Sequence, residues 1–329
     1  MKPPLLEIDG LRTHFFTRAG VVKAVDDVSF TVRKGEVLGL VGESGSGKSM
    51  TGYSIMGLID PPGRIVDGTI CLNGQDLRKL SAEDLRQLRG NRIAMIFQDP
   101  MMTLNPVLSV AVQMVETILA HEDVPRDAAL GRARDALVKV GIPSPDERLR
   151  AYPHQFSGGM RQRVAIAIAL LNNPDLIIAD EPTTALDVTI QGQILFEMQK
   201  LTRETGAAMI WITHDLSVVA GLADRVCVMY AGRIVEQGTV ADVLTHPRHP
   251  YTQGLLDSVP SRSVRGARLK QIPGMAPSVL DLPDGCAFRA RCGHATEACA
   301  AAPEMRSLVG DTNWQSVRCH HPLGARAAT

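Results

Sequence analysis

Residues 37–49 read VLGLVGESGSGKS. The run at 37–41 predicts a buried strand, and the turn after it fits the phosphate-loop pattern G-x-x-x-x-G-K-S in full. Helical spacing over 49–58 completes the order strand, loop, helix, which is the context that a phosphate loop requires. Glycine lets backbone N–H groups approach a phosphate closely, and the helix N-terminus adds a favourable dipole. The stretch therefore predicts a nucleotide site in an α/β core.

Several residues of this loop are candidate ligands of the nucleotide. Lys48 would reach the β- and γ-phosphates, and the Ser49 hydroxyl would ligate Mg²⁺. The alternative is a glycine-rich turn that carries a lysine by chance. The candidates for ATP binding in this stretch are Gly42, Ser44, Gly45, Ser46, Gly47, Lys48, Ser49 and Met50.

A second apolar run ends in two carboxylates. Residues 176–181 read LIIADE, which predicts a buried strand followed by acids at its carboxyl end. Asp180 would hold Mg²⁺, through water in most such sites, and Glu181 would polarise the attacking water as general base. Two acids after a strand are also common at a solvated strand end, so this interpretation depends on the phosphate loop.

The rest of the chain alternates strand and helix patterns. Strands are expected at 69–73, 92–97, 175–180, 208–213 and 225–230, and helices at 108–121, 128–140 and 158–171. This predicts an α/β P-loop ATPase core with a mostly parallel sheet, N-terminal antiparallel strands, and a helical insertion at about 101–172. The core is expected to occupy 1–245. Residues 246–329 are expected to form a small, loop-rich, Cys-rich C-terminal extension.

Composition excludes some classes of function. The chain has 329 residues, 45% of them hydrophobic and 21% charged, which suits one large domain with an extension. Lys plus Arg and Asp plus Glu both number 35, so no overall basic field favours nucleic acid as a partner. The N-terminus lacks the pattern of a signal peptide, and the apolar runs are far shorter than the roughly 20 residues that span a bilayer. A cytoplasmic protein is expected.

A third stretch of sequence indicates which class of nucleotide-binding protein this is. Residues 156–163 read FSGGMRQR and precede the run that ends at Glu181. Together with the phosphate loop, this set resembles the ATP-binding-cassette ATPases. The resemblance implies that Ser157, Gly158 and Gly159 cap the nucleotide held by another cassette, with free N–H groups at a helix start available for an anion. The alternative is that Ser157 only caps its own helix.

The same resemblance implies roles for four further residues. His214, after the strand at 208–213, would contact the γ-phosphate, although a histidine at a strand end is more often structural. Gln98 would sense Mg²⁺ and the attacking water and would link the core to the helical insertion. Asp187 belongs to a stretch that resembles the loop through which two cassettes communicate. Phe15, or its neighbour Phe16, would stack on adenine, with core packing as the alternative.

Longer stretches resemble one branch of the family, the oligopeptide/dipeptide importer ATPases. They are residues 98–106 (QDPMMTLNP), 152–156 (YPHQF), 187–191 (DVTIQ) and 249–252 (HPYT). The resemblance implies a peptide-import motor at the cytoplasmic face of the inner membrane, working with a second homologous ATPase, two transmembrane permease subunits and an extracytoplasmic peptide-binding protein. The alternatives are the same motor for nickel or another small solute, a soluble cassette ATPase, or a P-loop kinase.

Four of the six cysteines lie close together in the sequence. Cys286, Cys292, Cys299 and Cys319 have the spacing C-x₅-C-x₆-C-x₁₉-C. Disulfides are disfavoured in the cytoplasm, so four thiols in a loop-rich segment favour a metal site. Structural zinc usually has tighter C-x₂₋₄-C pairs, whereas four thiolates can bind a [4Fe–4S] cluster. The family resemblance implies such a cluster; zinc or no metal are the alternatives.

Overall fold

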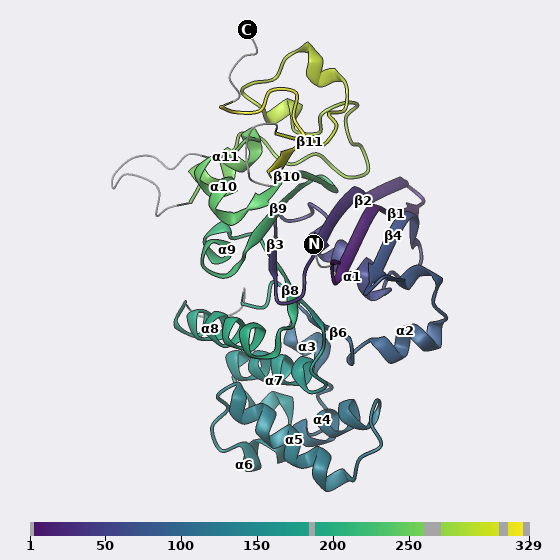
Figure 1. Ribbon diagram of the computed structural model, residues 1–329, viewed down its shortest axis with the longest axis vertical. Helices are drawn as coiled ribbons and strands as arrows, with labels where there is room; N and C mark the ends of the chain where they lie inside the picture. Colours follow the sequence, from purple (N-terminus) through teal and green to yellow (C-terminus); the bar gives the residue numbers. More distant parts are fainter. Residues whose placement is uncertain (1–2, 184–187, 260–270, 309–314, 325–329) are drawn as a thin grey trace. The chain divides into compact units, whose positions relative to one another are not determined.

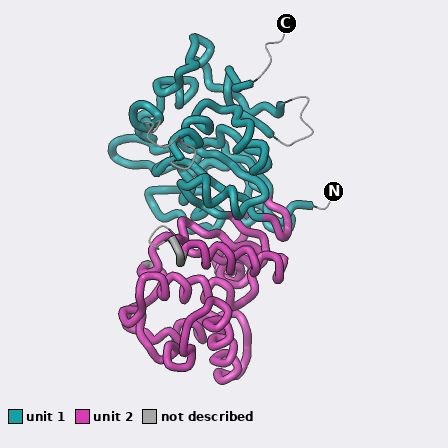
Figure 2. The backbone as a smooth tube through the Cα atoms, turned by 90° about the vertical axis from the view of Figure 1, so that its left-hand side faces the viewer, with its two compact units in different colours: residues 1–31, 37–78, 211–329 teal, residues 32–36, 79–210 magenta. Residues whose placement is uncertain are grey.

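A computed structural model of the protein describes residues 3–183, 188–259, 271–308 and 315–324 (Figure 1). The chain divides into two compact units (Figure 2). The first unit contains residues 1–31, 37–78 and 211–329, and the second contains residues 32–36 and 79–210. In the described ranges, no helix combines the length and the apolar character needed to cross a bilayer.

An antiparallel sheet forms one part of the first unit. Its strands, in order across the sheet, are β2 (Gly20–Val32), β1 (Leu6–Thr17), β4 (Gly63–Leu72) and β5 (Gln75–Asp76), and the short helix η1 (Leu77–Lys79) follows. Leu6 and Ile8 are buried while Glu7 and Asp9 are exposed, which is the two-residue period of a half-buried strand. The predicted N-terminal antiparallel strands are therefore confirmed.

Most strands of a second, mixed sheet also belong to this unit. Their order is β11 (Arg306–Ser307), β12 (Ser316–Val317), β10 (Arg233–Thr239), β9 (Arg225–Tyr230) and β3 (Val37–Val41). The pair β3 and β9 is parallel, and the pairs from β9 to β11 are antiparallel. All five residues of β3 are buried, as expected of a strand covered on both faces. The last segment of the chain thus extends the sheet that carries the phosphate loop.

Helices of the first unit, among them α9, α10 and α11, contribute to one hydrophobic core. Val41, Val228, Tyr251 and Phe288 belong to a single buried cluster, so the C-terminal segment shares its core with β3 and β9. Figure 1 shows α10 and α11 beside β9 and β10. The helices are α1 (Lys48–Met56), α9 (Leu216–Leu222), α10 (Val240–Thr245), α11 (Pro250–Asp257), η4 (Arg289–Arg291) and η5 (Glu297–Ala300).

The second unit combines parallel strands with a helical bundle. Strands β6 (Ile93–Ile96) and β7 (Leu176–Asp180) are parallel, and β8 (Ala208–Thr213) begins in this unit and ends in the first. The helices are α2 (Ala82–Leu88), α3 (Pro100–Thr103), α4 (Val110–Leu119), α5 (Arg126–Lys139), α6 (Pro145–Arg150), η2 (Pro153–Gln155), α7 (Gly158–Leu170) and α8 (Val188–Thr205).

Local sequence explains the helical bundle. Ser109 caps α4, because its hydroxyl accepts a hydrogen bond from the backbone N–H of Val112 at 3.4 Å. The buried residues of α4 include Val110, Met114 and Ile118, which share one helix face at a spacing of four. Helix α4 packs with α5 and α7 in a bundle (Figure 1). The predicted class, an α/β fold with a mixed, mostly parallel main sheet and a helical segment, is confirmed.

Candidate functional site

The phosphate loop begins where β3 ends and is built against neighbouring backbone. A Cβ atom on Gly42 would lie 2.2 Å from the carbonyl oxygen of Met229, a distance that no side chain tolerates. Gly47 has φ of +101°, and a Cβ there would lie 2.3 Å from the carbonyl oxygen of Ala24. Both glycines are therefore required by close approach, and the loop is pressed between β9 and β2.

Lys48 opens helix α1 and lies over the loop. Its side chain is buried, and Nζ donates hydrogen bonds to the carbonyl oxygens of Gly42 and Glu43, each at 2.9 Å. The backbone carbonyl of Ser46 accepts a hydrogen bond from the N–H of Gly232 at 2.9 Å, which ties the loop to the turn after β9. The structure thus places the predicted ammonium against the loop, with Ser49 half-buried beside it in the first turn of α1.

Two other predicted residues lie in the first unit. His214 is exposed directly after β8, and Asp215 next to it caps α9 by accepting from the N–H of Ser217 at 2.8 Å. Phe15 is half-buried in β1 opposite Gly63, where its ring lies so close that a Cβ on Gly63 would meet Cε1 at 2.5 Å. Phe16 is 40% exposed, with the guanidinium of Arg64 4.2 Å from its ring centroid. Packing thus accounts for Phe15, while Phe16 offers a ring at the surface.

The second unit brings two predicted catalytic residues together. Asp180 ends β7 and is 1% exposed, and Glu181 follows it with a backbone φ of +43°. A positive φ is uncommon for a residue other than glycine and is typical of functional sites. Because β6 and β7 are parallel, their carboxyl ends meet at one edge of the sheet, and Gln98 Nε2 donates to Glu181 Oε2 at 3.3 Å.

The serine-glycine stretch also lies in the second unit, at the start of α7. Ser157 is the N-cap, and its hydroxyl accepts from the N–H of Met160 at 3.3 Å. Ser157 and Gly158 are exposed, so this end of a 13-residue helix faces solvent in the isolated chain. Asp187, the remaining predicted contact between cassettes, lies outside the described residues.

The four C-terminal cysteines belong to the first unit and converge. One small cavity is lined by Cys286, Cys292, Cys299 and Cys319, with His294, His320 and His321 beside them. Burial raises the pKa of Cys286 and Cys292, and it raises the pKa of Cys319 to about 11. The backbone N–H of His294 points at Cys292 Sγ from 3.4 Å, and that of His321 at Cys319 Sγ from 3.3 Å.

The four thiols are chemically suited to bind a metal, but the cavity that they line is small. Four sulfurs, of which Cys292 and Cys319 face a backbone N–H, are the kind of surroundings that thiolate-ligated clusters use. None of the six cysteines, each in the described part of the chain, forms a disulfide, and no three or more His, Cys, Asp or Glu side chains described here are grouped so as to hold a metal ion. The cavity measures about 10 Å³, so the thiols would have to move apart to take up a cluster.

Contacts to the phosphate loop include residues that the sequence motifs did not indicate. Glu43, inside the loop, is held by Tyr251 and Arg291 from the C-terminal part of the chain. Tyr251 stands in the stretch 249–252, whose sequence indicates the family but no contact with the loop, and Arg291 stands beside Cys292. In the sequence, only the position of Tyr251 and Arg291 in or beside these characteristic stretches marks the two residues.

Family comparisons cover both parts of the chain. Residues 25–184 match the family described as ABC transporter, and residues 235–299 match the family described as oligopeptide/dipeptide transporter, C-terminal region. The second match includes Cys286, Cys292 and Cys299.

Individual proteins agree with the family matches. The chain is similar to the oligopeptide transport ATP-binding protein OppD of Salmonella typhimurium, with 50% identity over 92% of this chain and 90% of that protein. It is 47% identical to the dipeptide transport ATP-binding protein DppD of Escherichia coli, over 97% of each chain. Among solved structures, the ATP-binding cassette MJ0796, a dimer in a post-hydrolysis state bound to ADP and Pi, matches with a TM-score of 0.65 and 26% identity, over 71% of this chain and 98% of that one.

Proposed function

This chain belongs to the family of ATP-binding proteins of oligopeptide and dipeptide ABC importers, and we propose that it binds and hydrolyses MgATP to drive the import of peptides. One observation carries the proposal: a complete phosphate loop and the serine-glycine stretch stand in a chain that relatives named for peptide transport match along nearly its whole length. Peptides are favoured over nickel or another small solute because the C-terminal family match is to oligopeptide and dipeptide transporters.

Each described site residue then has a chemical task. The loop N–H groups and Lys48 bind the phosphates, and the oxygens of Ser49 and Asp180 are the hard donors that Mg²⁺ prefers. Mg²⁺ would neutralise charge between the β- and γ-phosphates. Glu181 accepts the proton of the attacking water, and Gln98 donates to that carboxylate and holds it in place. His214 would contact the γ-phosphate.

The serine-glycine stretch implies a second cassette. Ser157, Gly158 and Gly159 present an exposed helix N-terminus, which is a ready site for an anion. In the proposed mechanism this end caps the γ-phosphate of ATP bound to a second, homologous ATPase, and Asp187 helps the two cassettes communicate. ATP binding closes the pair, and hydrolysis with phosphate release reopens it. The dimeric cassette structure among the similar proteins supports this arrangement.

The membrane parts of the importer would come from other chains. We infer two transmembrane permease subunits, which receive the motion through the helical segment at about 101–172, and an extracytoplasmic protein that delivers the peptide. The chain would sit at the cytoplasmic face of the inner membrane as a peripheral subunit. A soluble cassette ATPase or a P-loop kinase would need no such partners.

Affinity purification of the tagged full chain from detergent-solubilised native membranes tests this assembly. We expect mass spectrometry to identify two permeases, a sister ATPase and a peptide-binding protein. Recovery of soluble proteins alone would contradict the transport role, and ATP binding measured on the same sample would show whether the cassette chemistry still holds.

The cysteines of the proposed extension, residues 246–329, are assigned to a [4Fe–4S] cluster. Four thiols lining one cavity support this, as does a spacing that lacks the close pairs of structural zinc sites. The cluster would hold the extension together. Protein purified without oxygen should contain about four iron and four sulfide per chain.

Matched cysteine variants sharpen this test. Cys319→Ser should lose the iron, whereas Cys71→Ser, in strand β4 and away from the cavity, should keep it. Zinc as the only metal, or iron retained by Cys319→Ser, would contradict the assignment.

A further inference from the structure

Within the first unit, a partly buried ion pair joins the cysteine-bearing segment to the phosphate loop. Arg291 Nη1 lies 2.7 Å from Glu43 Oε2, and Arg291 Nη2 lies 2.9 Å from Glu43 Oε1. The Arg291 side chain is 6% exposed and that of Glu43 is 29% exposed. Two parallel hydrogen bonds between charged groups fix both the position and the orientation of the carboxylate, which a single contact would not.

The backbone of Glu43 is held as well as its side chain. Its N–H donates to the hydroxyl of Tyr251 at 2.8 Å, and its carbonyl oxygen accepts from Lys48 Nζ at 2.9 Å. Tyr251 is fully buried, so its hydroxyl has a fixed position. Every polar group of Glu43 is therefore engaged, and the partners of its carboxylate and its N–H both lie beyond residue 250.

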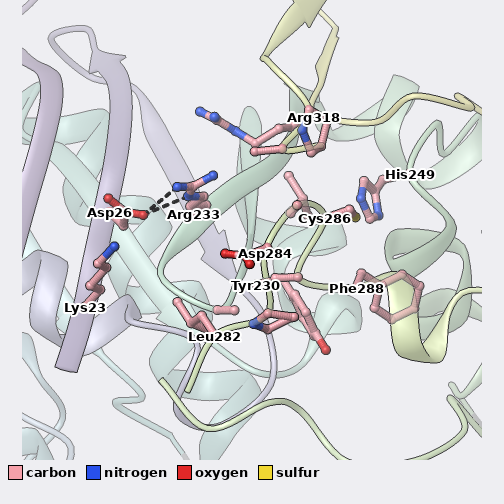
Figure 3. Close-up of a pocket in the computed structure, with 17 residues that line it drawn as sticks. Lys23, Asp26, Tyr230, Arg233, His249, Leu282, Asp284, Cys286, Phe288 and Arg318 are labelled. Carbon is pink, nitrogen blue, oxygen red and sulfur yellow. Dashed lines mark hydrogen bonds and ion pairs between the residues drawn. The ribbon is translucent and has the colours of Figure 1, made fainter. Parts of the chain in front are cut away.

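Aromatic packing ties these partners to the cysteines. Phe288, between Cys286 and Cys292 in the sequence, packs edge-on to Tyr230 at 5.3 Å between centroids and lies 5.5 Å from Tyr251. Figure 3 shows Cys286, Phe288 and Tyr230 at one side of a pocket whose other side carries the ion pair of Asp26 with Arg233. The segment that bears the cysteines thus reaches the phosphate loop through a continuous set of buried contacts.

We propose that Arg291 is a positioning residue for ATP binding: through Glu43 it holds the phosphate loop in its binding conformation, so that the folded cysteine-bearing segment sets the affinity for nucleotide. The inference rests on the proposed function of the loop. The competing explanation is that Arg291 serves only the fold of its own segment, since Nε also donates to the carbonyl oxygen of Pro273 at 2.9 Å and Nη1 lies 3.3 Å from the Tyr230 hydroxyl.

A double-mutant cycle on ATP affinity separates these explanations. Glu43→Gln, Arg291→Met and the double variant are made in the full chain, purified without oxygen, and titrated with a fluorescent ATP analogue in the presence of Mg²⁺. We expect each single substitution to weaken binding roughly tenfold. The double variant should be no weaker than the singles, because all three lose the same contact. The KM for ATP should rise with the Kd, while kcat stays within about twofold.

Controls keep the test decisive. Arg289→Met removes an exposed charge two positions away and should leave the Kd unchanged. If Arg291→Met fails to fold, Glu43→Gln alone carries the test, since it leaves the other contacts of Arg291 in place. An unchanged Kd in Glu43→Gln, or effects of the two substitutions that multiply in the double variant, would overturn the inference. Failure of the wild-type chain to bind ATP would instead overturn the proposed function.

Discussion

The side-chain amide of Gln98 and the carboxylate of Glu181 meet at the carboxyl ends of two neighbouring parallel strands, with Nε2 3.3 Å from Oε2. Eighty-three positions separate them in the chain, and the pairing of β6 with β7 brings them together. The positive φ of Glu181 turns the backbone sharply after the buried Asp180. An amide that donates to the carboxylate restricts its rotation, which is the arrangement a positioned general base requires.

Glu181→Gln keeps the shape of this pair and removes the basic oxygen. We expect kcat for ATP hydrolysis to fall at least about 100-fold, because a general base contributes 10²–10⁴ to the rate, while ATP still binds. Single-turnover hydrolysis and nucleotide retention measure the two effects. Glu204→Gln, an exposed acid near the end of α8, is the control and should behave like the wild type. Wild-type turnover in Glu181→Gln would remove Glu181 from the role of base.

Ser157→Ala tests whether the serine-glycine stretch does more than cap a helix. Ser109 is the matched control, since it caps α4 in the same way that Ser157 caps α7. Each alanine variant should lose about 1 kcal/mol of unfolding free energy from the lost cap. Only Ser157→Ala should also slow ATP hydrolysis by the assembled pair of ATPases. Equal hydrolysis by both variants would mean that Ser157 is a cap alone.

Asp26 makes a stability contribution that depends on pH. Burial raises its pKa, but hydrogen bonds and charge from Arg233, together with the charges of Lys23 and Arg12, outweigh this and hold the pKa below its usual value of 3.8. The folded state therefore gains stability above that value and loses it as the pH falls through the folded pKa. Asp26→Asn should destabilise the chain by about 2 kcal/mol at pH 7, since it leaves the partly buried Arg233 without its charged partner.

Urea unfolding at a series of pH values checks this contribution. The difference between wild type and Asp26→Asn should be constant near neutrality and shrink below about pH 4. Asp67→Asn is the control, because Asp67 pairs with Arg12 at an exposed position and should contribute little at any pH. A difference that grows on acidification would contradict the account.

The sequence was sufficient to predict the central elements because their signals are local. The strands at 37–41, 208–213 and 225–230 have the predicted bounds, since they are short apolar runs bounded by turn residues. β4 begins at Gly63, before the predicted 69–73, and the sequence missed this start because residues 64–68 are exposed or half-buried and include Gly68 at φ of +87°. Polar residues and glycines in this part of β4 interrupt the alternation of apolar and polar residues that predicts a strand.

The C-terminal segment shows what local patterns cannot predict. Strand β12 has only two residues, and it is a strand because β10 offers a free edge for pairing. The contact of Arg291 with Glu43 spans 248 positions, and neither residue type nor spacing indicates it. The four cysteines, by contrast, stand in one short stretch of the sequence and line one small cavity, while their role as metal ligands stays a prediction.

The most direct test of the central claim is peptide uptake driven by this chain's own hydrolysis. Cells lacking the chromosomal copy would be supplied with the wild type, Glu181→Gln or Glu204→Gln, and accumulation of a labelled tripeptide would be followed. We predict that the wild type and Glu204→Gln restore uptake and that Glu181→Gln does not, although all three chains reach the membrane in equal amounts. Uptake that continues without the chain, or with Glu181→Gln, would contradict its role as the motor of peptide import.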